Sequence, residues 1–476
     1  MTKLKLRGKD LHRIGFSDNR HVALAIRLAQ QHCRHMSKPK VLVQLKQILA
    51  RPDKFCEDET WGPLACVLLD QQLPQSDNVH MPSPSQTTQV ALRTVTSDFP
   101  VFGSDIEPAA LQQMQTAMQL PVARAGALMP DAHQGYGLPI GGVLATEDAV
   151  IPFGVGVDIG CRMALSVFPI SPQALQHHKQ HFKQLLIEHT RFGREEFAHP
   201  MDDEVLDRAE FREFPLLRKL HKKAARQIGT SGSGNHFVEW GIVEVKVFDA
   251  QLGLEPGVYV GLLSHSGSRH LGAAIANHYT KVAMSKRALP KHARHLAWLR
   301  LDEAEGIEYW RLMHLAGDYA AANHRHIHLR MTRALGEQPI ATVANHHNFA
   351  WKEPLPDGTP VVIHRKGATP AAKGLLGIIP GSMADPGYIV RGRGCDVSLH
   401  SAAHGAGRKM SRTQAKKLIS RKELLHMLTA KGIELIGGGL DEAPIAYKDI
   451  DEVMRHQRDL VDIVGIFRPI IVRMDQ

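Results

Sequence analysis

The sequence has few cysteines. Its 476 residues include five, an odd number, and they are widely scattered along the chain. A disulfide-stabilised fold needs paired cysteines, so this pattern argues against a disulfide framework and indicates a reducing compartment. Only Cys161 lies in a motif suited to metal binding. Cys33 and Cys66 lie in apolar segments with helical spacing, and we expect them to be packed thiols.

The sequence also lacks long apolar runs. None reaches the roughly 20 residues that a helix needs to cross a bilayer. The segment from Met1 to Asp10 is basic but has no apolar core of the kind found in signal peptides. We therefore expect a cytoplasmic protein with no membrane partner. No internal repeat is apparent either.

Length and local composition divide the chain into three parts. A chain of 476 residues is long enough for two domains. Residues 1–75 carry apolar side chains at helical spacing and predict a small helical accessory module. Residues 76–98 are rich in proline, serine, threonine and glutamine, which is the composition of a linker. The main domain is predicted over residues 99–476.

Helical and strand patterns alternate within the main domain and favour an α+β fold. Residues 258–263 form an apolar run typical of a buried strand, and a helix is predicted to follow as far as about residue 284. Residues 293–335 are helical and rich in histidine, arginine and glutamate. We expect them to form a solvated pair of helices on the outside.

Positive charge predominates. The formal net charge is +10, and the chain contains 29 histidines. A positive excess favours a polyanionic partner, RNA or DNA, because binding releases counterions. Many proteins are mildly basic without such a partner, so charge is only a weak indication. The abundance of histidine also means that a single one carries little weight without a motif.

Five side chains are candidates for a metal site. Asp158 and Cys161 lie in one glycine-rich turn, whereas His236, His265 and His347 lie in other loops and strand ends. One carboxylate, one thiolate and three imidazoles suffice for two ions if the thiolate bridges them. Ligand softness alone favours zinc. Each histidine taken singly is more simply a core or turn residue, and spacing does not decide between these interpretations.

Two glycine-rich segments and one histidine suggest phosphate chemistry. Gly232-Ser-Gly-Asn and Gly381-Ser-Met offer backbone amides that can hold phosphate oxygens, although tight turns are the commoner use. Neither is a Walker or Rossmann pattern. His404 precedes Gly405-Ala-Gly, so nothing bulky shields its imidazole. Such an imidazole can attack phosphorus and carry a nucleotidyl group, but a further ligand or a turn residue is the alternative.

These motifs belong to a larger set of short segments between about residue 100 and the C-terminus. The set comprises Met129-Pro-Asp-Ala-His-Gln-Gly-Tyr-Gly, Gly156-Val-Asp-Ile-Gly-Cys, Gly232-Ser-Gly-Asn-His-Phe-Val-Glu, Ser264-His-Ser-Gly-Ser-Arg, His347-Asn348, Arg365-Lys-Gly-Ala-Thr, Pro380-Gly-Ser-Met, His404-Gly-Ala-Gly-Arg and Glu442-Ala-Pro-Ile-Ala-Tyr-Lys. In this order and combination the segments resemble the RtcB family of GTP-dependent RNA ligases.

The resemblance implies a catalytic domain in which mixed β-sheets with flanking helices surround a deep metal-containing cleft. It implies a ligase of tRNA splicing and RNA repair that joins a 3′-phosphate or 2′,3′-cyclic phosphate RNA end to a 5′-hydroxyl end. GTP would guanylate the histidine, the guanylyl group would pass to the RNA 3′-phosphate, and the 5′-hydroxyl would displace GMP. Two Mn²⁺ ions are the implied cofactors, and an activating protein is a further implied partner.

The resemblance also implies roles for individual residues, with His404 as the catalytic nucleophile. One manganese ion is assigned to Asp158, Cys161 and His236, and the other to Cys161, His265 and His347. The implied guanylate contacts are Asn235, His236, Phe237, Val238, Glu239, His347, Asn348, Pro380, Gly381, Ser382, Met383, His404, Gly405, Ala406, Gly407, Tyr447 and Arg473. The candidates for RNA phosphates are Arg269, Arg408 and Arg412. Asp131 and His133 are expected to orient the metal ligands without binding the ions themselves.

The sequence departs from the family pattern at three places. Arg162 follows Cys161 where a glycine is usual. The segment Gly381-Ser-Met-Ala-Asp-Pro-Gly-Tyr differs from the family's Gly-Ser-Met-Gly-Thr-Ala-Ser-Tyr, so Gly387 replaces a guanylate-binding serine. Arg473 matches a lysine that meets guanine in the family, and it keeps the charge but not the geometry. Base preference is therefore less firmly implied than the metal set.

Other functions stay open on the sequence alone. The same chemistry can stop at a capped 3′-phosphate, which would make the protein a nucleotidyl transferase of RNA repair. The three departures are also compatible with a non-catalytic, metal-dependent RNA-binding paralogue. A binuclear phosphoesterase is the remaining alternative, and the retained histidine at position 404 disfavours it.

Overall fold

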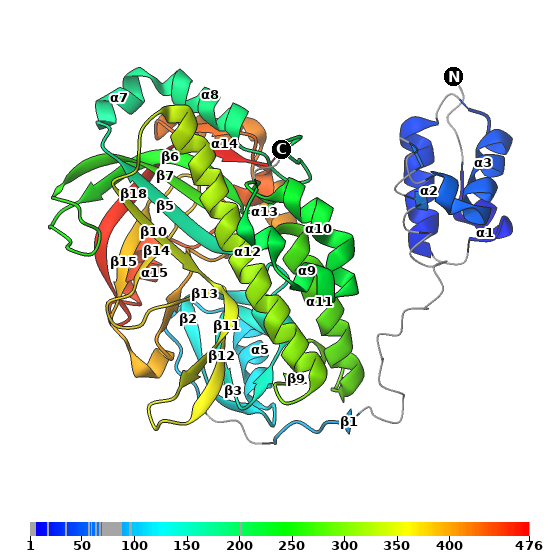
Figure 1. The fold of residues 1–476 in the computed structure, drawn as a ribbon, viewed down its shortest axis with the longest axis horizontal. Helices are drawn as coiled ribbons and strands as arrows, with labels where there is room; N and C mark the ends of the chain where they lie inside the picture. The colour runs from blue at the N-terminus through cyan, green and yellow to red at the C-terminus, as the bar shows by residue number, and fades with distance from the viewer. Residues whose placement is uncertain are drawn as a thin grey trace. The chain divides into compact units, whose positions relative to one another are not determined.

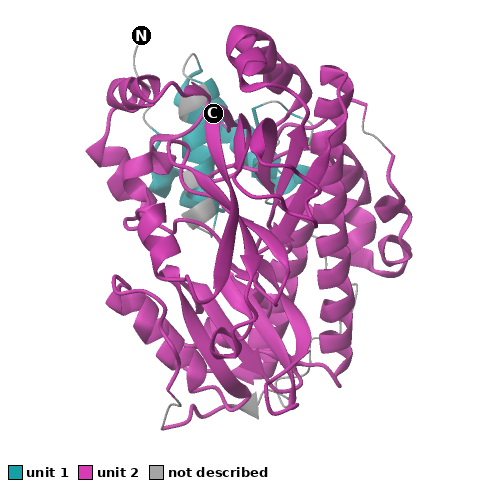
Figure 2. Ribbon diagram, turned by 90° about the vertical axis from the view of Figure 1, so that its left-hand side faces the viewer, with its two compact units in different colours: residues 1–81 teal, residues 82–476 magenta. Residues whose placement is uncertain are grey.

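The structure of the chain is a computed structural model that describes residues 6–16, 19–33, 36–55, 58, 60, 61, 64, 65, 68, 88–94, 98–199 and 202–475. The chain divides into two compact units, Met1–Met81 and Pro82–Gln476 (Figure 2). Residues 76–87 and 95–97 of the predicted linker, like Cys66, lie outside the described residues. Among the helices that are described, none is both long and apolar enough to cross a bilayer.

The first unit is helical in its described part. Its elements are α1 Gly8–Arg13, α2 Asn19–His32, α3 Lys38–Ala50 and the 3-10 helix η1 Pro52–Phe55. Val41, Leu45 and Ile48 recur every three to four residues on α3 and are fully buried in one apolar cluster. Cys33 is a free, buried thiol of the same cluster, which confirms its prediction as a packed side chain.

The second unit is built on a large mixed sheet (Figure 1). The strand order is β10-β5-β7-β6-β18-β15-β14, with β17 paired to β18. Each neighbouring pair is antiparallel except β17 with β18, which is parallel. The strands are β5 Arg162–Phe168, β6 Phe237–Val245, β7 Gly257–Ser266, β10 Ala341–His346, β14 Leu376–Ile379, β15 Gly387–Gly392, β17 Glu434–Ile436 and β18 Val461–Met474.

A smaller antiparallel sheet has the order β11-β12-β3-β2. Its strands are β2 Ala123–Tyr136, β3 Leu138–Thr146, β11 Asn348–Pro354 and β12 Pro360–Lys366. Short pairs complete the strand structure: β1 Thr88–Gln89 with β8 Arg287–Ala288, β4 Ala149–Val150 with β9 Leu299–Arg300, and β13 Ala368–Pro370 with β16 Ser401–Ala403. The predicted α+β class with mixed sheets is confirmed.

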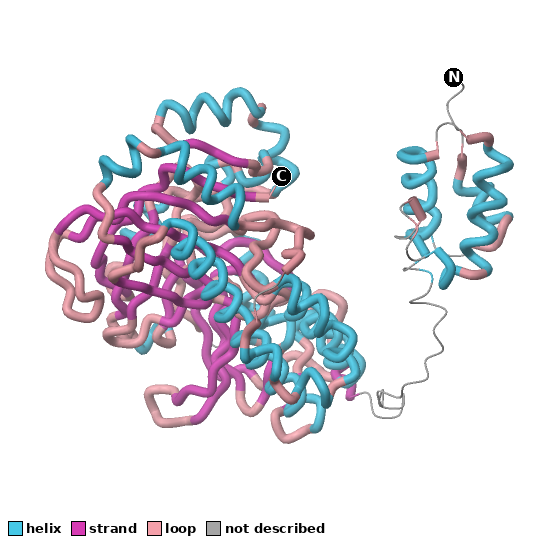
Figure 3. The backbone as a smooth tube through the Cα atoms, turned by 45° about the horizontal axis from the view of Figure 1, so that its top comes forward, coloured by secondary structure: helices cyan, strands magenta, loops and turns pink. Residues whose placement is uncertain are grey.

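Helices flank these sheets, as Figure 3 shows by colour. They are α5 Pro108–Met118, α6 Pro152–Val155, α7 Pro172–His177, α8 Lys179–His189, α9 Glu210–Glu213, α10 Pro215–Gln227, α11 Arg269–Lys286, α12 Ala304–Leu335, α13 Arg412–Leu418, α14 Arg421–Ala430 and α15 Ile450–Arg455. Ile327 and Met331 of α12 share an apolar cluster with Trp240 of β6 and Leu262 of β7. The longest helix therefore packs against the large sheet.

The solvated helical pair predicted over residues 293–335 is wrong. Most of that segment is the single helix α12, and one of its faces is buried. His324 Nδ1 and His328 Nε2 on this face lie 2.7 and 2.8 Å from the hydroxyl of Ser264, and His328 Nδ1 lies 2.7 Å from that of Ser166. Polar side chains can be buried when strand hydroxyls satisfy them. Residue type alone suggested solvent exposure and could not reveal these partners.

Candidate active site

Four neighbouring strands bring the candidate metal ligands to one edge of the large sheet. Cys161 directly precedes β5, His236 directly precedes β6, and His265 is the penultimate residue of β7, which lies between them. His347 follows β10, and its backbone N–H donates to the Cys161 carbonyl at 2.9 Å. Antiparallel pairing therefore gathers side chains that are far apart along the chain.

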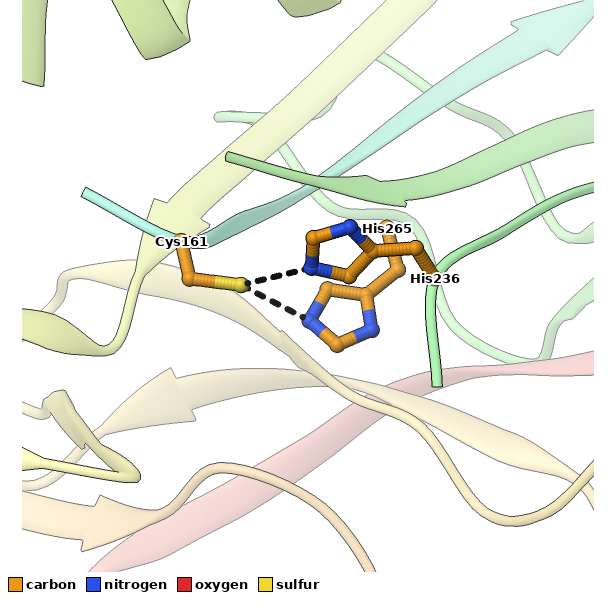
Figure 4. Close-up of side chains that lie close together, drawn as sticks. All are labelled: Cys161, His236 and His265. Carbon is orange, nitrogen blue, oxygen red and sulfur yellow. Dashed lines mark hydrogen bonds between the residues drawn. The ribbon is translucent and has the colours of Figure 1, made fainter. Parts of the chain in front are cut away.

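The donor atoms of Cys161, His236 and His265 converge (Figure 4). Cys161 Sγ lies 3.2 Å from His265 Nε2 and 3.4 Å from His236 Nε2. His347 Nε2 lies 3.3 Å from His265 Nε2, and Asp158 Oδ2 lies 3.0 Å from His236 Nε2. Donors bound tetrahedrally at about 2.0–2.3 Å from an ion are roughly 3.3–3.8 Å apart. The spacings therefore approach those of metal coordination. Cys161 belongs to both expected ligand sets, the one with Asp158 and His236 and the one with His265 and His347.

The protonation state of His265 suits a metal ligand. Its Nδ1 donates to the Asn235 carbonyl at 2.9 Å, so its Nε2 carries a lone pair directed toward Cys161. Burial lowers the pKa of His265 to about 3, and the neighbouring His236 adds to the effect. The imidazole is therefore neutral near pH 7, which is the form that binds a metal.

Cys161 and Asp158 differ in their protonation. Burial raises the pKa of the Cys161 thiol well above its usual value, and the Asp158 carboxylate adds to the rise. Burial also opposes ionisation of Asp158, but hydrogen bonds from His236 and Cys161 and the charge of Arg269 together outweigh it and lower the pKa of that carboxyl. The protein alone keeps Cys161 protonated, so a cation that binds its sulfur has to displace the proton.

A buried asparagine of α12 fixes the segments that carry the histidines of β6 and β7. Asn323 Oδ1 accepts from the backbone N–H groups of Gly229 and Thr230 at 2.7 and 3.1 Å. Its Nδ2 donates to the Thr230 carbonyl at 2.9 Å and to Ser266 Oγ at 3.1 Å. One side chain therefore ties the loop before β6 to the end of β7.

His404 is held by a single buried carboxylate. Asp131 Oδ2 lies 2.5 Å from His404 Nδ1 and accepts from the backbone N–H groups of His404 and Gly405 at 3.1 and 3.3 Å. Because Nδ1 donates to this oxygen, His404 Nε2 keeps its lone pair. The His404 and His347 rings lie 5.0 Å apart between centroids. Asp131 thus supports the candidate nucleophile beside the candidate ligands.

A cavity of about 320 Å³ joins these groups, within the range of about 300–1,000 Å³ common for small-molecule sites. The expected site residues along it are Asp158, Cys161, Asn235, His236, Phe237, Glu239, His265, His347, Asn348, Pro380, Gly381, Ser382, Met383, His404, Gly405, Ala406, Gly407 and Tyr447. His133, Arg408 and Arg412 also line it. The candidate metal ligands, the candidate nucleophile and residues of both glycine-rich segments, Asn235 of the first and Gly381-Ser-Met of the second, therefore share one cavity.

Val238 and Arg473 lie outside this cavity. They are cross-strand partners on β6 and β18. Alternate residues of a strand point to opposite faces of the sheet, so Phe237 and Glu239 line the cavity and Val238 does not. Arg473 donates instead to the Leu186 carbonyl. Neither side chain enters the function proposed below.

The three arginines expected at RNA phosphates already have protein partners. Arg408 Nη1 lies 3.2 Å from Glu442 Oε2, and Arg412 Nη1 lies 2.8 Å from Asp441 Oδ2 and also contacts Glu442. Arg269 does not line the cavity. Its Nη2 donates to a backbone carbonyl at 2.6 Å, and burial lowers its pKa. Of the three arginines, only Arg408 and Arg412 thus line the cavity.

Sequence reasoning gave no role to two carboxylates along the cavity. Glu442 is 2% exposed and accepts from the Tyr447 hydroxyl as well as from two arginines. Asp385 accepts from Ser382 Oγ at 2.5 Å and pairs with Lys431 at 3.0 Å. The place of Glu442 in a recognised segment was a usable signal. Asp385 also lies in a recognised segment, at a position that departs from the family pattern, but an acidic loop residue alone is a weak signal because such residues are common on surfaces.

The departures from the family pattern differ in position. The Arg162 guanidinium lies 2.9 Å from His346 Nδ1 and away from the cavity, and burial lowers its pKa to about 10. Gly387 does line the cavity, and a Cβ added there would lie 3.3 Å from Pro380 Cα. The change at position 387 therefore alters the cavity wall, and the change at position 162 does not.

Comparison with known proteins agrees with this geometry. Residues 112–214 and 208–475 match the family model described as tRNA-splicing ligase RtcB. The chain belongs to the RtcB family. Within RtcB, the matched residues include all of the candidate ligands, the nucleophile and Asp131. The family inferred from the motifs is therefore confirmed.

The chain aligns with several curated RtcB relatives over most of their length. The RNA-splicing ligase RtcB1 of Escherichia coli is 33% identical over 405 residues, covering 78% of this chain and 95% of that protein. The tRNA-splicing ligase RtcB of Nanoarchaeum equitans is 31% identical over 439 residues, covering 77% and 91%. The RNA-splicing ligase RtcB of Mycobacterium tuberculosis is 32% identical over 436 residues, covering 76% and 99%.

The donor set of this RtcB chain fits bound metal. Thiolate, imidazole and carboxylate groups are the ligands of divalent transition metals. His265 Nε2 and His347 Nε2 face each other at 3.3 Å, although His265 has no proton to offer there. A cation between the two nitrogens would turn this contact into coordination. The site therefore has the chemistry of a metal centre.

Replacing Cys161 is expected to weaken metal binding. Cys161→Ala removes the one donor shared by both groups, so we expect affinity for Mn²⁺ and Zn²⁺ to fall at least about tenfold. Equilibrium dialysis with elemental analysis measures this. Cys395→Ala is the matched control, because Cys395 is a free cysteine outside the cavity. Equal metal content in both variants would contradict the assignment.

Proposed function

We propose that this chain is an RNA ligase that uses GTP and two divalent metal ions. It joins an RNA 3′-phosphate or 2′,3′-cyclic phosphate end to a 5′-hydroxyl end. The observation that carries the proposal is the pair formed by Asp131 and His404, which leaves His404 Nε2 free beside the candidate ligands in one cavity. RNA as substrate is supported by the names of the relatives.

The first step guanylates the histidine. His404 Nε2 attacks the α-phosphorus of GTP, an N–P bond forms, and the P–O bond to pyrophosphate breaks. The imidazole gains positive charge during the attack. Asp131 Oδ2, 2.5 Å from Nδ1, stabilises that charge and holds the ring in place.

Two further transfers complete ligation. An oxygen of the RNA 3′-phosphate attacks the guanylyl phosphorus, and the N–P bond breaks so that Nε2 regains its lone pair. The 5′-hydroxyl then attacks the RNA 3′-phosphorus, loses its proton and displaces GMP. A cyclic phosphate end must first be opened by water to give the 3′-phosphate.

The metal ligands divide into two sets in this proposal. Asp158, Cys161 and His236 would hold one ion, and Cys161, His265 and His347 would hold the other. Two divalent ions would supply positive charge that offsets the charge building on the phosphates. Manganese follows from the family resemblance, whereas the thiolate and imidazole donors alone favour zinc.

Glu239 supports a preference for guanine. Its carboxyl group faces the cavity, has no hydrogen-bonding partner among the described residues, and has a pKa raised well above its usual value by burial. Buried polar groups need partners. Guanine N1–H and N2–H are two adjacent donors whose hydrogen bonds would favour the ionised carboxylate against the effect of burial, whereas adenine presents an acceptor at N1.

His404 is expected to carry the covalent guanylyl group. Incubation with MnCl₂ and α-labelled GTP should label the wild-type protein, and His404→Ala should abolish the label because it removes the imidazole whose Nε2 is proposed to attack the α-phosphorus. His400→Ala is the control, since His400 lies in the same segment but outside the cavity. Absence of label with every NTP would overturn the proposal. Joined RNA as the product, rather than a stable 3′ cap, separates ligation from end capping.

The tautomer of His404 is expected to matter as much as its position. Asp131→Asn keeps the shape but loses the negative charge, so we expect adduct formation to slow by roughly 10²–10⁴-fold. Single-turnover rates with labelled GTP measure this. Metal content should match that of the wild type, because Asp131 is not a proposed ligand. A rate within twofold of the wild type would contradict the role of Asp131.

Glu239 is expected to select the nucleotide. Glu239→Gln replaces one of the two acceptor oxygens with an NH₂ donor, which would face a donor of guanine. We therefore expect the GTP-over-ATP preference in adduct formation to fall at least about tenfold. Glu244→Gln on the same strand is the control, because Glu244 pairs with Arg468 outside the cavity. An unchanged preference would remove Glu239 from base recognition.

A further inference from the structure

An aromatic cluster lies outside the cavity and has no part in the chemistry above. The Tyr136 ring lies 6.4 Å from that of Phe153 and 6.1 Å from that of His295 between centroids, and the latter two rings are 4.9 Å apart. Lys366 Nζ lies 4.8 Å from the centre of the Phe153 ring. We call these four residues the aromatic cluster.

Tyr136 is exposed although its neighbours are largely covered. Its side chain is 70% exposed, whereas Phe153 and His295 are half-buried and Lys366 is 5% exposed. A tyrosine that served only to fill the core would be covered instead. Its ring therefore offers an apolar face to a partner from solvent.

The backbone that carries Tyr136 is fixed. The Lys366 ammonium donates to the Tyr136 carbonyl at 2.6 Å. The Gln113 side chain donates to the Gly135 carbonyl at 2.6 Å and accepts from its N–H at 3.0 Å, and Glu107 accepts from the Gln134 N–H. A ring held on such a hairpin loses little conformational entropy when a partner binds.

Three chain segments connect the aromatic cluster to the cavity. Strand β2 carries both His133, which lines the cavity, and Tyr136. Lys366 precedes Gly367, where a Cβ would lie 3.2 Å from His404 Cε1. Phe153 precedes Asp158 by five residues. At most about 10 Å of strand separates His133 from Tyr136, so the cluster lies within a short distance of the nucleophile.

We propose that Tyr136 is a stacking platform for a nucleobase of the RNA beside the ends being joined. The inference rests on the proposed function, in which RNA ends reach His404. Bases of single strands stack on exposed aromatic rings, and nearby cations attract the phosphates that follow. The exposed Arg294 of the adjoining turn supplies positive charge beside His295 of the cluster, whereas Lys366 is buried and burial lowers its pKa to about 7. The partner is thus single-stranded RNA, recognised without regard to base identity.

Stacking by Tyr136 contributes to RNA affinity rather than to chemistry. Loss of one base–aromatic contact costs about 1–3 kcal/mol, which corresponds to roughly 5- to 150-fold in affinity. Tyr136→Ala is therefore expected to raise KM for RNA about tenfold while kcat at saturating RNA changes less than twofold. Tyr136→Phe and Tyr136→Trp keep a ring and should restore KM.

The decisive experiment combines this substitution with a missing base. Ligation of RNA with an abasic nucleotide at either end is compared between wild type and Tyr136→Ala. If the Tyr136 ring stacks on the missing base, removing that base should raise KM in the wild type but add little to KM in Tyr136→Ala. Full additivity at both ends, or a KM within twofold of wild type for Tyr136→Ala, overturns the proposal. Phe248→Ala is the matched control, since Phe248 is 52% exposed but outside the cavity and the aromatic cluster.

A second measurement does not depend on ligation. RNA carrying 2-aminopurine next to its 3′-phosphate or its 5′-hydroxyl is titrated with protein, and wild type should quench one of the two probes more than Tyr136→Ala does. Equal quenching of both probes by the two proteins overturns the inference. A wild-type protein that forms no histidine adduct but shows the quenching difference would instead overturn the proposed function and keep the RNA platform.

Discussion

The contact on which the site depends is that between the Cys161 sulfur and two imidazole nitrogens within 3.4 Å of it. It exists because β5, β6 and β7 are antiparallel neighbours in strict register. A slip of one residue between two strands would turn every side chain to the other face of the sheet. The register of a large sheet, rather than any local motif, therefore determines whether the donors meet.

The charges along the cavity explain why cations belong there. Four acidic side chains line it, Asp158, Glu239, Asp385 and Glu442, and burial favours the neutral form of Glu239; the two guanidinium groups are those of Arg408 and Arg412. The net charge of +10 is therefore not concentrated at the place where phosphates would bind. Two divalent ions would reverse the sign of this space. The buried, neutral imidazole of His265 prepares for such ions without adding repulsion.

Much of the candidate site could be predicted from the sequence because its chemistry is concentrated in short glycine-rich segments. Donor types and their place at strand ends pointed to Asp158, Cys161 and the histidines. The relation of Asp131 to His404 could not be foreseen, because it joins residues 273 positions apart. Val238 was expected at the site because it lies in a motif of consecutive residues, and Arg473 because it matches a lysine of the family. A strand presents only alternate residues to a cavity, so both side chains lie outside it.

The fold class followed from alternating helical and strand patterns, but the environment of α12 did not. Its histidines resemble surface residues until the hydroxyls of Ser166 and Ser264 are placed opposite them. Hydrophobic periodicity identifies a helix and its apolar face, but it cannot show which polar side chains find partners in a neighbouring strand. Burial of polar groups is decided by tertiary contacts, and these were not visible in the chain.

The single helix α12 has a mechanical consequence. With 32 residues it is a rod about 48 Å long. Its Asn323 side chain is hydrogen-bonded both to the loop before β6 and to the end of β7. Any shift of this rod along its axis would carry both histidine-bearing segments with it. The coordination geometry would then be lost or regained as one unit, not ligand by ligand.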